Sequence, residues 1–291
     1  RAAAGGWHWQ DRRKAAVPTT FYPYTPIYMH LRYLTYLLFL LTAGSSCALK
    51  EEADLVLPKS PSRLFVEGYL SPGQPIRLSL IRSSSFQQDL SLQLEWYARV
   101  EVILPDTMVT LQNMLYRESE SGKIVNYASS YRLPAVPLQD SVRLRIVTED
   151  GMETLYAATE PVAPVAIEEW SLGEKQITVS CANAQGAGNR YYGLYLQYEL
   201  DGKTIRKSEY YDYSQVGEAR LTFRLDVPLG KRPYRIILYR ITPANYTFQR
   251  ALQRASRSNV DPFEPPVVLP TNVRGGQGMF TYSTADTLLI N

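Results

Sequence analysis

The sequence predicts an all-β protein made of two consecutive β-sandwich domains of the immunoglobulin or fibronectin type, with one short helix near the C-terminus. Three observations support this prediction. Apolar and polar residues alternate with a period of two in many short segments, Asp-Gly pairs separate some of them, and 22 tyrosines stand against 8 phenylalanines. Alternation places one face of a strand in a core and the other in water. Tyrosine suits such strands because its ring packs while its hydroxyl reaches water.

The first sandwich is expected at residues 62–162. Its alternating segments predict strands at residues 64–70, 76–82, 98–104, 141–148 and 153–158. Asp150-Gly151 separates the last two segments. This pair favours a two-residue hairpin turn, in which both central residues need a positive φ.

The second sandwich is expected at residues 163–291. Pro161, Pro164 and the stretch between them indicate a domain junction. Alternation resumes after it and predicts strands at residues 176–180, 191–200, 204–210, 221–225 and 234–239. Asp201-Gly202 predicts a second hairpin.

One segment, residues 242–255, has the pattern of a helix. Thr242 can cap its N-terminus and Pro243 fits the first turn. Tyr246, Phe248 and Ala251 follow with helical spacing.

The N-terminal region has the organisation of a lipoprotein signal peptide at residues 29–46. Met29 begins it, an apolar core covers residues 34–41, and small residues fill positions 43–46 before Cys47. The core is too short to span a bilayer as a permanent helix. Residues 1–28 are interpreted as an upstream extension that is not part of the mature protein.

Cys47 follows the small residues as the acylated cysteine of a lipoprotein does, so we expect lipid on its thiol. Gly44 stands where leucine is usual. An ordinary secretory signal with a chance cysteine is the alternative. Residues 47–61 are polar and contain prolines, which is typical of a tether. Within it, Lys50, Glu51 and Glu52 resemble the export signal that sends Bacteroidota lipoproteins to the outer leaflet, which predicts a cell-surface location.

Cleavage before Cys47 changes the chemistry that is available. His8 and His30 both precede it, so the mature chain has no histidine for a Ser-His-Asp or Cys-His site or for the common zinc sites. Residues 1–46 carry five basic residues and one acidic residue, which leaves 26 basic and 27 acidic residues. Such a balance lacks the excess of positive charge that is typical of proteins that bind nucleic acid. Cys181 then has no partner for a disulfide and is expected to be a buried apolar residue. No cofactor or metal is expected.

Several residues remain as candidates for ligand contact. Tyr210, Tyr211 and Tyr213 flank Asp212, and Trp96 and Trp170 are the tryptophans of the mature chain. These rings could stack on sugar or peptide, or they could simply pack in the core. Acidic residues that could serve a carboxylate-based hydrolase are Glu168, Glu169, Glu209 and Asp212.

The glycine-rich run Gly275-Gly276-Gln277-Gly278 is interpreted as a flexible turn. It is not a phosphate-binding loop, because no Lys-Ser/Thr pair follows it.

The C-terminal segment, residues 261–280, resembles the close of a Bacteroidota lipoprotein family catalogued as domain of unknown function 4249. The similar stretches are Asp-Pro-Phe-Glu-Pro-Pro at 261–266, Pro-Thr-Asn-Val at 270–273 and Gly-Gly-Gln-Gly-Met-Phe at 275–280, and the opening strand at 64–69 is also similar. The resemblance implies an outer-membrane β-rich lipoprotein without established activity, encoded near TonB-dependent transporters. The first hypothesis is therefore a non-enzymatic surface lipoprotein that serves such a transporter as an accessory binding subunit. A stand-alone adhesin or glycan- or peptide-binding module is the second, and a carboxylate-based hydrolase is a remote third.

Overall fold

The structure is a computed structural model that describes residues 32–38, 62–83, 93–119, 121–136, 138–184, 186–200, 202–261 and 263–290. The chain divides into two compact units, Arg1–Val56 and Leu57–Asn291. Residues 32–38 are helical and exposed, and they overlap the apolar core of the predicted signal peptide. Within the described ranges, no helix is both long and apolar enough to cross a membrane.

The second unit is mostly β-structure. Its first eight strands are β1 (Leu64–Leu70), β2 (Pro75–Arg82), β3 (Gln93–Leu94), β4 (Arg99–Ile103), β5 (Met108–Arg117), β6 (Ile124–Arg132), β7 (Val142–Val147) and β8 (Thr154–Thr159). The remaining elements are β9 (Glu169–Leu172), β10 (Gln176–Ala182), the 3₁₀ turn η1 (Ala187–Asn189), β11 (Tyr191–Leu200), β12 (Lys203–Asp212), β13 (Arg220–Asp226), β14 (Pro233–Ile241), α2 (Pro243–Ser258), β15 (Val273–Arg274) and β16 (Gln277–Leu289).

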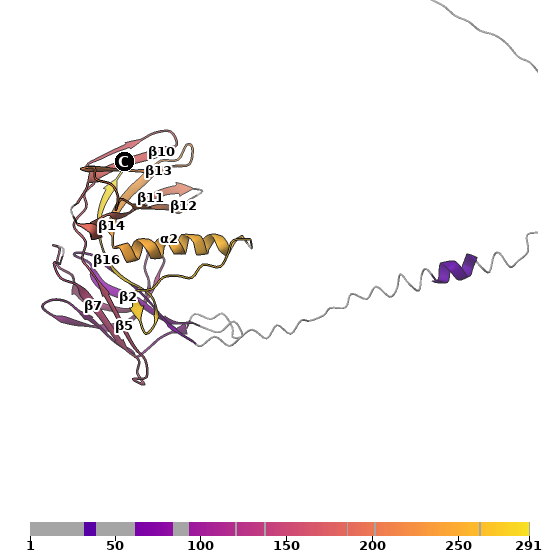
Figure 1. The fold of residues 1–291 in the computed structure, drawn as a ribbon, viewed down its shortest axis with the longest axis horizontal. Coiled ribbons are helices and arrows are strands. Elements are labelled where there is room, and N and C mark those ends of the chain that lie inside the picture. The colour runs from indigo at the N-terminus through magenta and orange to yellow at the C-terminus, as the bar shows by residue number, and fades with distance from the viewer. Residues whose placement is uncertain are drawn as a thin grey trace, which may run out of the picture. The chain divides into compact units, whose positions relative to one another are not determined.

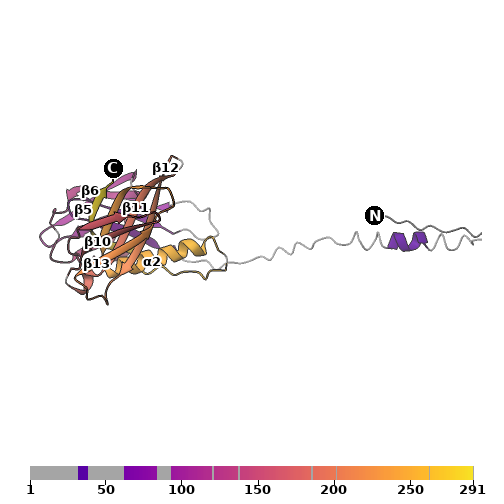
Figure 2. The ribbon, with the colours of Figure 1, turned by 90° about the horizontal axis from the view of Figure 1, so that it is seen from above.

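The described strands form one long sheet and one short one. The long sheet has the order β12-β11-β14-β16-β1-β2-β6-β5-β4-β7-β8-β15, with β3 paired to β2. The short sheet has the order β13-β10-β9. Figure 1 shows the strands of the C-terminal half gathered above those of the N-terminal half, and Figure 2 shows β10 and β13 layered against the long sheet.

Two hydrophobic cores stabilise this arrangement. The first is lined by alternate residues of β1, β2, β4, β7 and β8, such as Val66, Leu80 and Val100. The second lies between the short sheet and β11 and β14, with Val179 and Leu194 among its residues. Each core buries the apolar face that the alternation predicts, which is the main driving force for sheets to pack face to face.

β16 belongs to both halves. Its first part pairs in parallel with β1, from Phe65 opposite Gln277 to Leu70 opposite Tyr282. Its second part pairs antiparallel with β14, from Ile241 opposite Ser283 to Arg235 opposite Leu289. Phe280 and Tyr282 lie in the first core, and Leu288 packs against the second. One strand therefore joins the two cores through backbone hydrogen bonds.

The predicted fold class is confirmed: the unit is a β-protein with sandwich-like sheets and one helix near its C-terminus. The ten predicted strands all form. The boundary between two sandwiches at residue 162 stays a prediction, and the sharing of β16 is a feature that alternation did not indicate. β3, β5, β6, β9, β15 and β16 were not predicted.

The helix is confirmed in detail. Thr242 is the N-cap, and its hydroxyl accepts a hydrogen bond of 3.2 Å from the Asn245 N–H. Pro243 occupies the first turn, where a missing N–H costs nothing. Phe248 and Ala251 are buried, and α2 contacts β11, β12 and β16.

The first hairpin turn differs from the prediction. The Gly151 N–H donates to the Thr148 carbonyl at 2.9 Å, and only Gly151 of the pair has a positive φ. The loop is therefore longer than two residues, with glycine at its left-handed position. In the second hairpin, Leu200 pairs with Lys203 and Gly202 has a φ of 72°, whereas Asp201 lies outside the described residues.

The interpretation of residues 275–278 as a turn holds for Gly275 and Gly276, which connect β15 to β16, but not for the last two residues. Gln277 and Gly278 are the first residues of β16. Gly278 has a φ of 110°, and a Cβ at this position would lie 1.9 Å from the Val66 carbonyl oxygen. Glycine is required here because the backbones of β1 and β16 approach too closely for any side chain.

We predict that Gly278→Ala lowers the free energy of unfolding by at least about 3 kcal/mol, because it adds a backbone clash to an unfavourable φ. Gly230→Ala is the matched control, since Gly230 has a φ of 74° and no atom within 4 Å of the added Cβ. It should cost only about 1 kcal/mol. Urea unfolding of both variants measures the difference. Equal losses would contradict the assigned role of Gly278.

Candidate functional site

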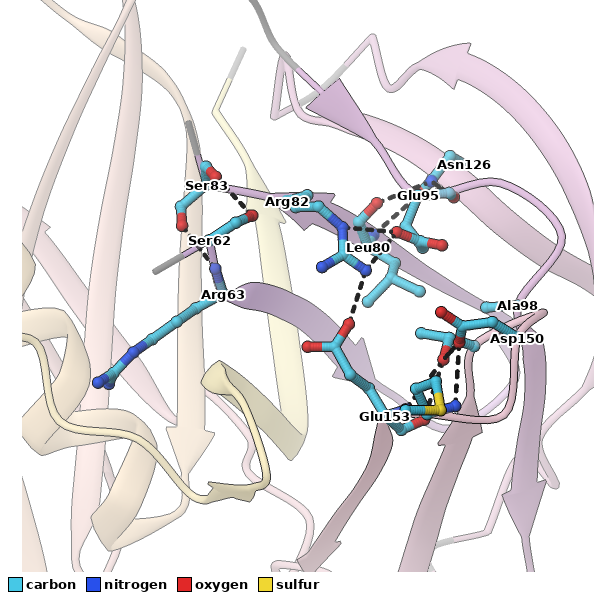
Figure 3. A network of polar contacts seen from close by, with 12 residues as sticks. Ser62, Arg63, Leu80, Arg82, Ser83, Glu95, Ala98, Asn126, Asp150 and Glu153 are labelled. Carbon is cyan, nitrogen blue, oxygen red and sulfur yellow. Dashed lines mark hydrogen bonds and ion pairs between the residues drawn. The ribbon is translucent and has the colours of Figure 1, made fainter. Parts of the chain in front are cut away.

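The first described residues of the second unit are fixed to the end of β2. The Ser62 hydroxyl donates to the Ser83 carbonyl at 2.9 Å, and the Arg63 N–H donates to the Ser83 hydroxyl at 2.8 Å. Figure 3 shows this contact beside the polar network of Arg82. The chain that follows the predicted tether is thus held in place from its first residues.

Arg82 connects two surface turns. Its Nε donates to Glu95 at 3.0 Å, and its Nη2 donates to Glu153 at 2.7 Å (Figure 3). Burial alone would lower the pKa of Arg82, but the hydrogen bonds that it donates to Glu153 and Glu95 outweigh burial and raise the pKa. The guanidinium therefore stays charged and clamps residues 95–98 beside the β7–β8 turn.

Asn126 of β6 fixes residues 95–98 from the inside. Its side chain is fully buried, accepts from the Leu80 N–H at 2.7 Å, and donates to the carbonyls of Leu80 and Glu95 at 2.9 Å. The neighbouring Tyr127 hydroxyl accepts from the Ala98 N–H at 2.9 Å. These bonds satisfy backbone groups that the short strand β3 leaves without a partner in the ladder.

The braced segment presents two aromatic rings to solvent. Tyr97 has a φ of 66°, the only positive value among the described non-glycine residues, and its side chain is 71% exposed. Trp96 is 37% exposed, and Met152 in the adjoining turn is also exposed. We call residues 62–63, 95–98 and 148–153 the tether end. Exposed aromatic rings on a strained, well-braced backbone are typical of a contact surface.

The adjoining β7–β8 turn is itself well ordered. Asp150 accepts hydrogen bonds from the Thr148 hydroxyl at 2.5 Å and the Met152 N–H at 3.0 Å. The hydrogen bond from Thr148 is the main cause that lowers the pKa of Asp150. The turn is therefore held in one shape while Met152 points outward.

Two of the predicted stacking tyrosines, Tyr211 and Tyr213, pack against the second core. Tyr211 and Tyr213 are stacked with an interplanar angle of 12°, and each meets Phe223 edge-on. Their hydroxyls donate to the carbonyls of Arg224 and Thr222. The structure brings these two rings together for packing, and a role in ligand stacking stays a prediction.

Tyr210 lies on the opposite face, under α2. Its hydroxyl donates to Gln249 at 3.0 Å, and Gln249 donates to the Tyr69 hydroxyl at 3.2 Å. Burial raises the pKa of Tyr69 well above its ordinary value, and the neighbouring Glu67 raises it further. Lys123 lies 3.8 Å above the Tyr69 ring and also contacts Glu67. This chain of side chains joins α2 to β1 and β12.

The acidic candidates are occupied by local contacts. Arg220 binds both Glu168 and Glu169, at 3.3 Å and 2.9 Å. Glu209 binds Arg250 at 2.9 Å, and Asp212 accepts from the Ser214 N–H. Trp170 of β9 is exposed, at the edge of the short sheet. In the described part of the chain, no group of three or more His, Cys, Asp or Glu residues is placed to hold a metal ion.

Sequence reasoning did not identify Arg82, Asn126 and Tyr97. Asn126 carried one available signal, because it is a polar residue in the middle of the apolar stretch that forms β6. The positive φ of Tyr97 has no counterpart in the sequence. The predicted lipidation site Cys47 and the export signal Lys50, Glu51 and Glu52 lie outside the described residues.

The fold and its braced aromatic surface define a β-rich protein with sandwich-like sheets and a surface suited to contacts. The chain belongs to the family described as Domain of unknown function (DUF4249), whose profile matches residues 50–288. The family resemblance noted at the C-terminal motif is thereby confirmed.

Other comparisons add little. No curated protein matches the chain. Among solved structures, it is similar to a DUF4785 family protein from Legionella pneumophila subsp. pneumophila str. Philadelphia 1, with 10% identity and a TM-score of 0.23. The match covers 60% of this chain and 51% of that one, so the chain spans about half the length of that protein.

We predict that Tyr97→Gly raises the free energy of unfolding by up to about 1 kcal/mol, because glycine accepts the positive φ at no steric cost. Tyr156→Gly is the control, since Tyr156 is a half-exposed residue within β8. It should lower stability by about 1 kcal/mol. Thermal unfolding followed by circular dichroism measures both changes. A similar loss in both variants would show that the Tyr97 backbone is not strained.

We also predict an alkaline loss of stability that depends on Cys181. Burial raises the pKa of this thiol to about 11, against an ordinary value of 9.0, although Arg240 opposes the shift. The unfolded chain loses this proton first, so the stabilisation is complete below pH 9 and decreases by up to roughly 2 to 3 kcal/mol as the pH rises to 11.

The measurement is urea unfolding at pH 8, 9, 10 and 11. Cys181→Ala should show a flatter pH dependence, because it keeps the tyrosines and removes the thiol. Parallel pH profiles for the two proteins would contradict the prediction.

Proposed function

We propose that this chain is a surface-exposed outer-membrane lipoprotein that acts by binding, without catalysis, as an accessory subunit of a TonB-dependent transporter. The observation that carries the proposal is the position of Cys47. It follows a signal-peptide pattern and precedes the family-matched region, which begins at residue 50, by three residues. A lipid on this thiol would place the folded unit directly at a membrane.

The geometry supports anchoring through one half of the fold and partner binding through the other. β16 runs for 13 residues from the Leu64 side of the fold to the second core, a span of about 40 Å for an extended strand. The short sheet packs on that second core, so Trp170 lies far from Ser62. A partner-binding surface around Trp170 would remain accessible on a protein held through residue 47.

β9 has the features of such a surface. It has only four residues, pairs with β10 alone among the described strands, and carries the exposed Trp170. Aromatic rings contribute strongly to protein interfaces when they lie on a rigid frame. Arg220 holds Glu168 and Glu169 beside this ring and so fixes their position.

The anchor is tested by fractionation. We predict that the native protein is found in the outer-membrane fraction, that mass spectrometry detects acyl chains on Cys47, and that externally added protease cleaves it on intact cells. Cys47→Ala should move the protein to the soluble fraction. An unmodified thiol on Cys47 would overturn the proposal.

The partner is tested by native purification in mild detergent. We predict that a β-barrel transporter co-purifies with the tagged protein, and that Trp170→Ala reduces its recovery at least tenfold. Tyr131→Ala is the control, because Tyr131 is similarly exposed on β6 in the other half. A monomer recovered under conditions that preserve known transporter complexes would favour the adhesin hypothesis, which glycan and host-protein arrays would then test.

A further inference from the structure

We propose that the tether end of the fold rests on the lipid bilayer, and that Trp96, Phe263 and Val268 enter its interface. This inference rests on the proposed lipid anchor at Cys47 and extends it, since a lipid on a tether does not by itself determine how the fold is oriented. The occupant of the surface is the membrane that holds the anchor.

The segment after α2 exposes an unusual amount of apolar surface. Phe263 is 94% exposed, Val268 is 90% exposed, and Val260 is also almost fully exposed. The described residues between the end of α2 and β15 form neither helix nor strand. Exposure of three large apolar side chains within nine residues is unfavourable in water. Their burial in a bilayer would lower the free energy.

This segment and the tether end lie on the same side of the unit. The segment after α2 leads into Gly276, whose backbone lies close to the start of β1. A Cβ added to Gly276 would lie 2.9 Å from the Leu64 carbonyl oxygen. Figures 1 and 2 both show the end of α2 and the chain after it on the side where β1 begins. Trp96 and Tyr97 belong to the same region, because Arg82 and Asn126 hold residues 95–98 beside the end of β2.

The length of the tether keeps the tether end close to the membrane. Fourteen residues lie between Cys47 and Ser62, and a fully extended chain of this length spans at most about 50 Å. The tether end therefore stays within one molecular diameter of the bilayer, at a high effective concentration. A protein partner would need to reach the same narrow space, whereas lipid is always present there.

The composition of the surface fits an interface of lipid and water. Tryptophan and tyrosine accumulate at the headgroup level, while phenylalanine and valine suit the acyl boundary. The basic residues Arg63, Arg82 and Arg257 are outnumbered by acidic ones on this surface, namely Glu95, Glu149, Asp150, Glu153, Asp261 and Glu264, so charge attraction to the bilayer does not drive the contact. The contact should therefore be mainly apolar and tolerate salt.

The two tryptophans of the mature chain provide the test, because Trp96 lies at the tether end and Trp170 lies at the other. The acylated full-length mature protein is reconstituted in vesicles of phosphatidylethanolamine and phosphatidylglycerol that contain brominated phosphatidylcholine. Trp170→Phe reports on Trp96 alone, and Trp96→Phe reports on Trp170 alone. We expect bromine to quench Trp96 fluorescence at least threefold more than that of Trp170, at both 0.05 M and 0.5 M salt.

Two further variants separate lipid contact from unfolding. Phe263→Ser with Val268→Ser, in the Trp170→Phe background, should halve the quenching of Trp96 or reduce it further. Leu229→Ser, at a 72% exposed residue of the β13–β14 turn, should leave the quenching unchanged. Circular dichroism confirms that each variant is folded.

The outcomes separate this inference from the proposed function. A lipidated Cys47 with equal quenching of the two tryptophans overturns the inference and leaves the anchor intact. An unmodified Cys47 overturns both. Quenching of Trp96 that persists in the double serine variant would show that the segment after α2 does not reach the bilayer, which also contradicts the inference as stated.

Discussion

The rest of the structure depends on the parallel pairing of β1 with the first half of β16. This pairing joins strands that are more than 200 residues apart in the chain, and it closes the first core against Phe280 and Tyr282. Parallel neighbours must be connected by a long crossover, and here nearly the entire unit serves as that crossover. Gly278 is the point of closest approach, where the Val66 carbonyl occupies the space that a side chain would need. The second half of β16 then pairs with β14 and so attaches the second core to the same strand.

A buried arginine secures the connection between the halves. Arg240 of β14 is almost fully buried, and its guanidinium donates to the carbonyls of Ala163, Pro164 and Ala182 and to the Tyr192 hydroxyl. All four acceptors are neutral oxygen atoms, so the desolvation cost of the charge is offset by several bonds and by the nearby Tyr192 ring. The Thr284 hydroxyl of β16 also donates to Ala163. The proline-rich junction is thus fixed to the sheet and does not behave as a free linker.

Local rules predicted the parts of the fold that local physics determines. Alternation identified the strands of both cores, and the Thr242–Pro243 pair located the start of α2. The same rules failed for β5, because its alternation is limited to Val109 and Leu111 and the following residues, Gln112, Asn113, Met114 and Leu115, are all exposed. They failed for β16 because Gly278 continues the glycine-rich run that forms the preceding turn, whereas its role is close backbone approach. Only the tertiary contact with Val66 distinguishes the two cases.

The candidate surface was predictable only in part, for a related reason. Composition drew attention to Trp96, but aromatic residues are equally common in cores, and Tyr210, Tyr211 and Tyr213 lie against protein on most sides. What distinguishes Trp96 and Tyr97 is the frame beneath them, built from Arg82 on β2 and from Asn126 and Tyr127 on β6. These long-range contacts leave no local pattern in the sequence.

The frame also explains why the tether end suits a contact surface better than the other exposed apolar residues do. A flexible loop loses conformational entropy when it orders against a partner, and that loss weakens binding. Residues 95–98 are already ordered by side chains from β2 and β6, and the positive φ of Tyr97 is maintained in the folded unit. The entropy lost in ordering residues 95–98 and the backbone strain at Tyr97 are therefore compensated during folding, by the contacts of the first core. A surface prepared in this way can gain nearly all of the free energy that burial of its rings provides, which matters for a protein whose tether supplies proximity but no orientation.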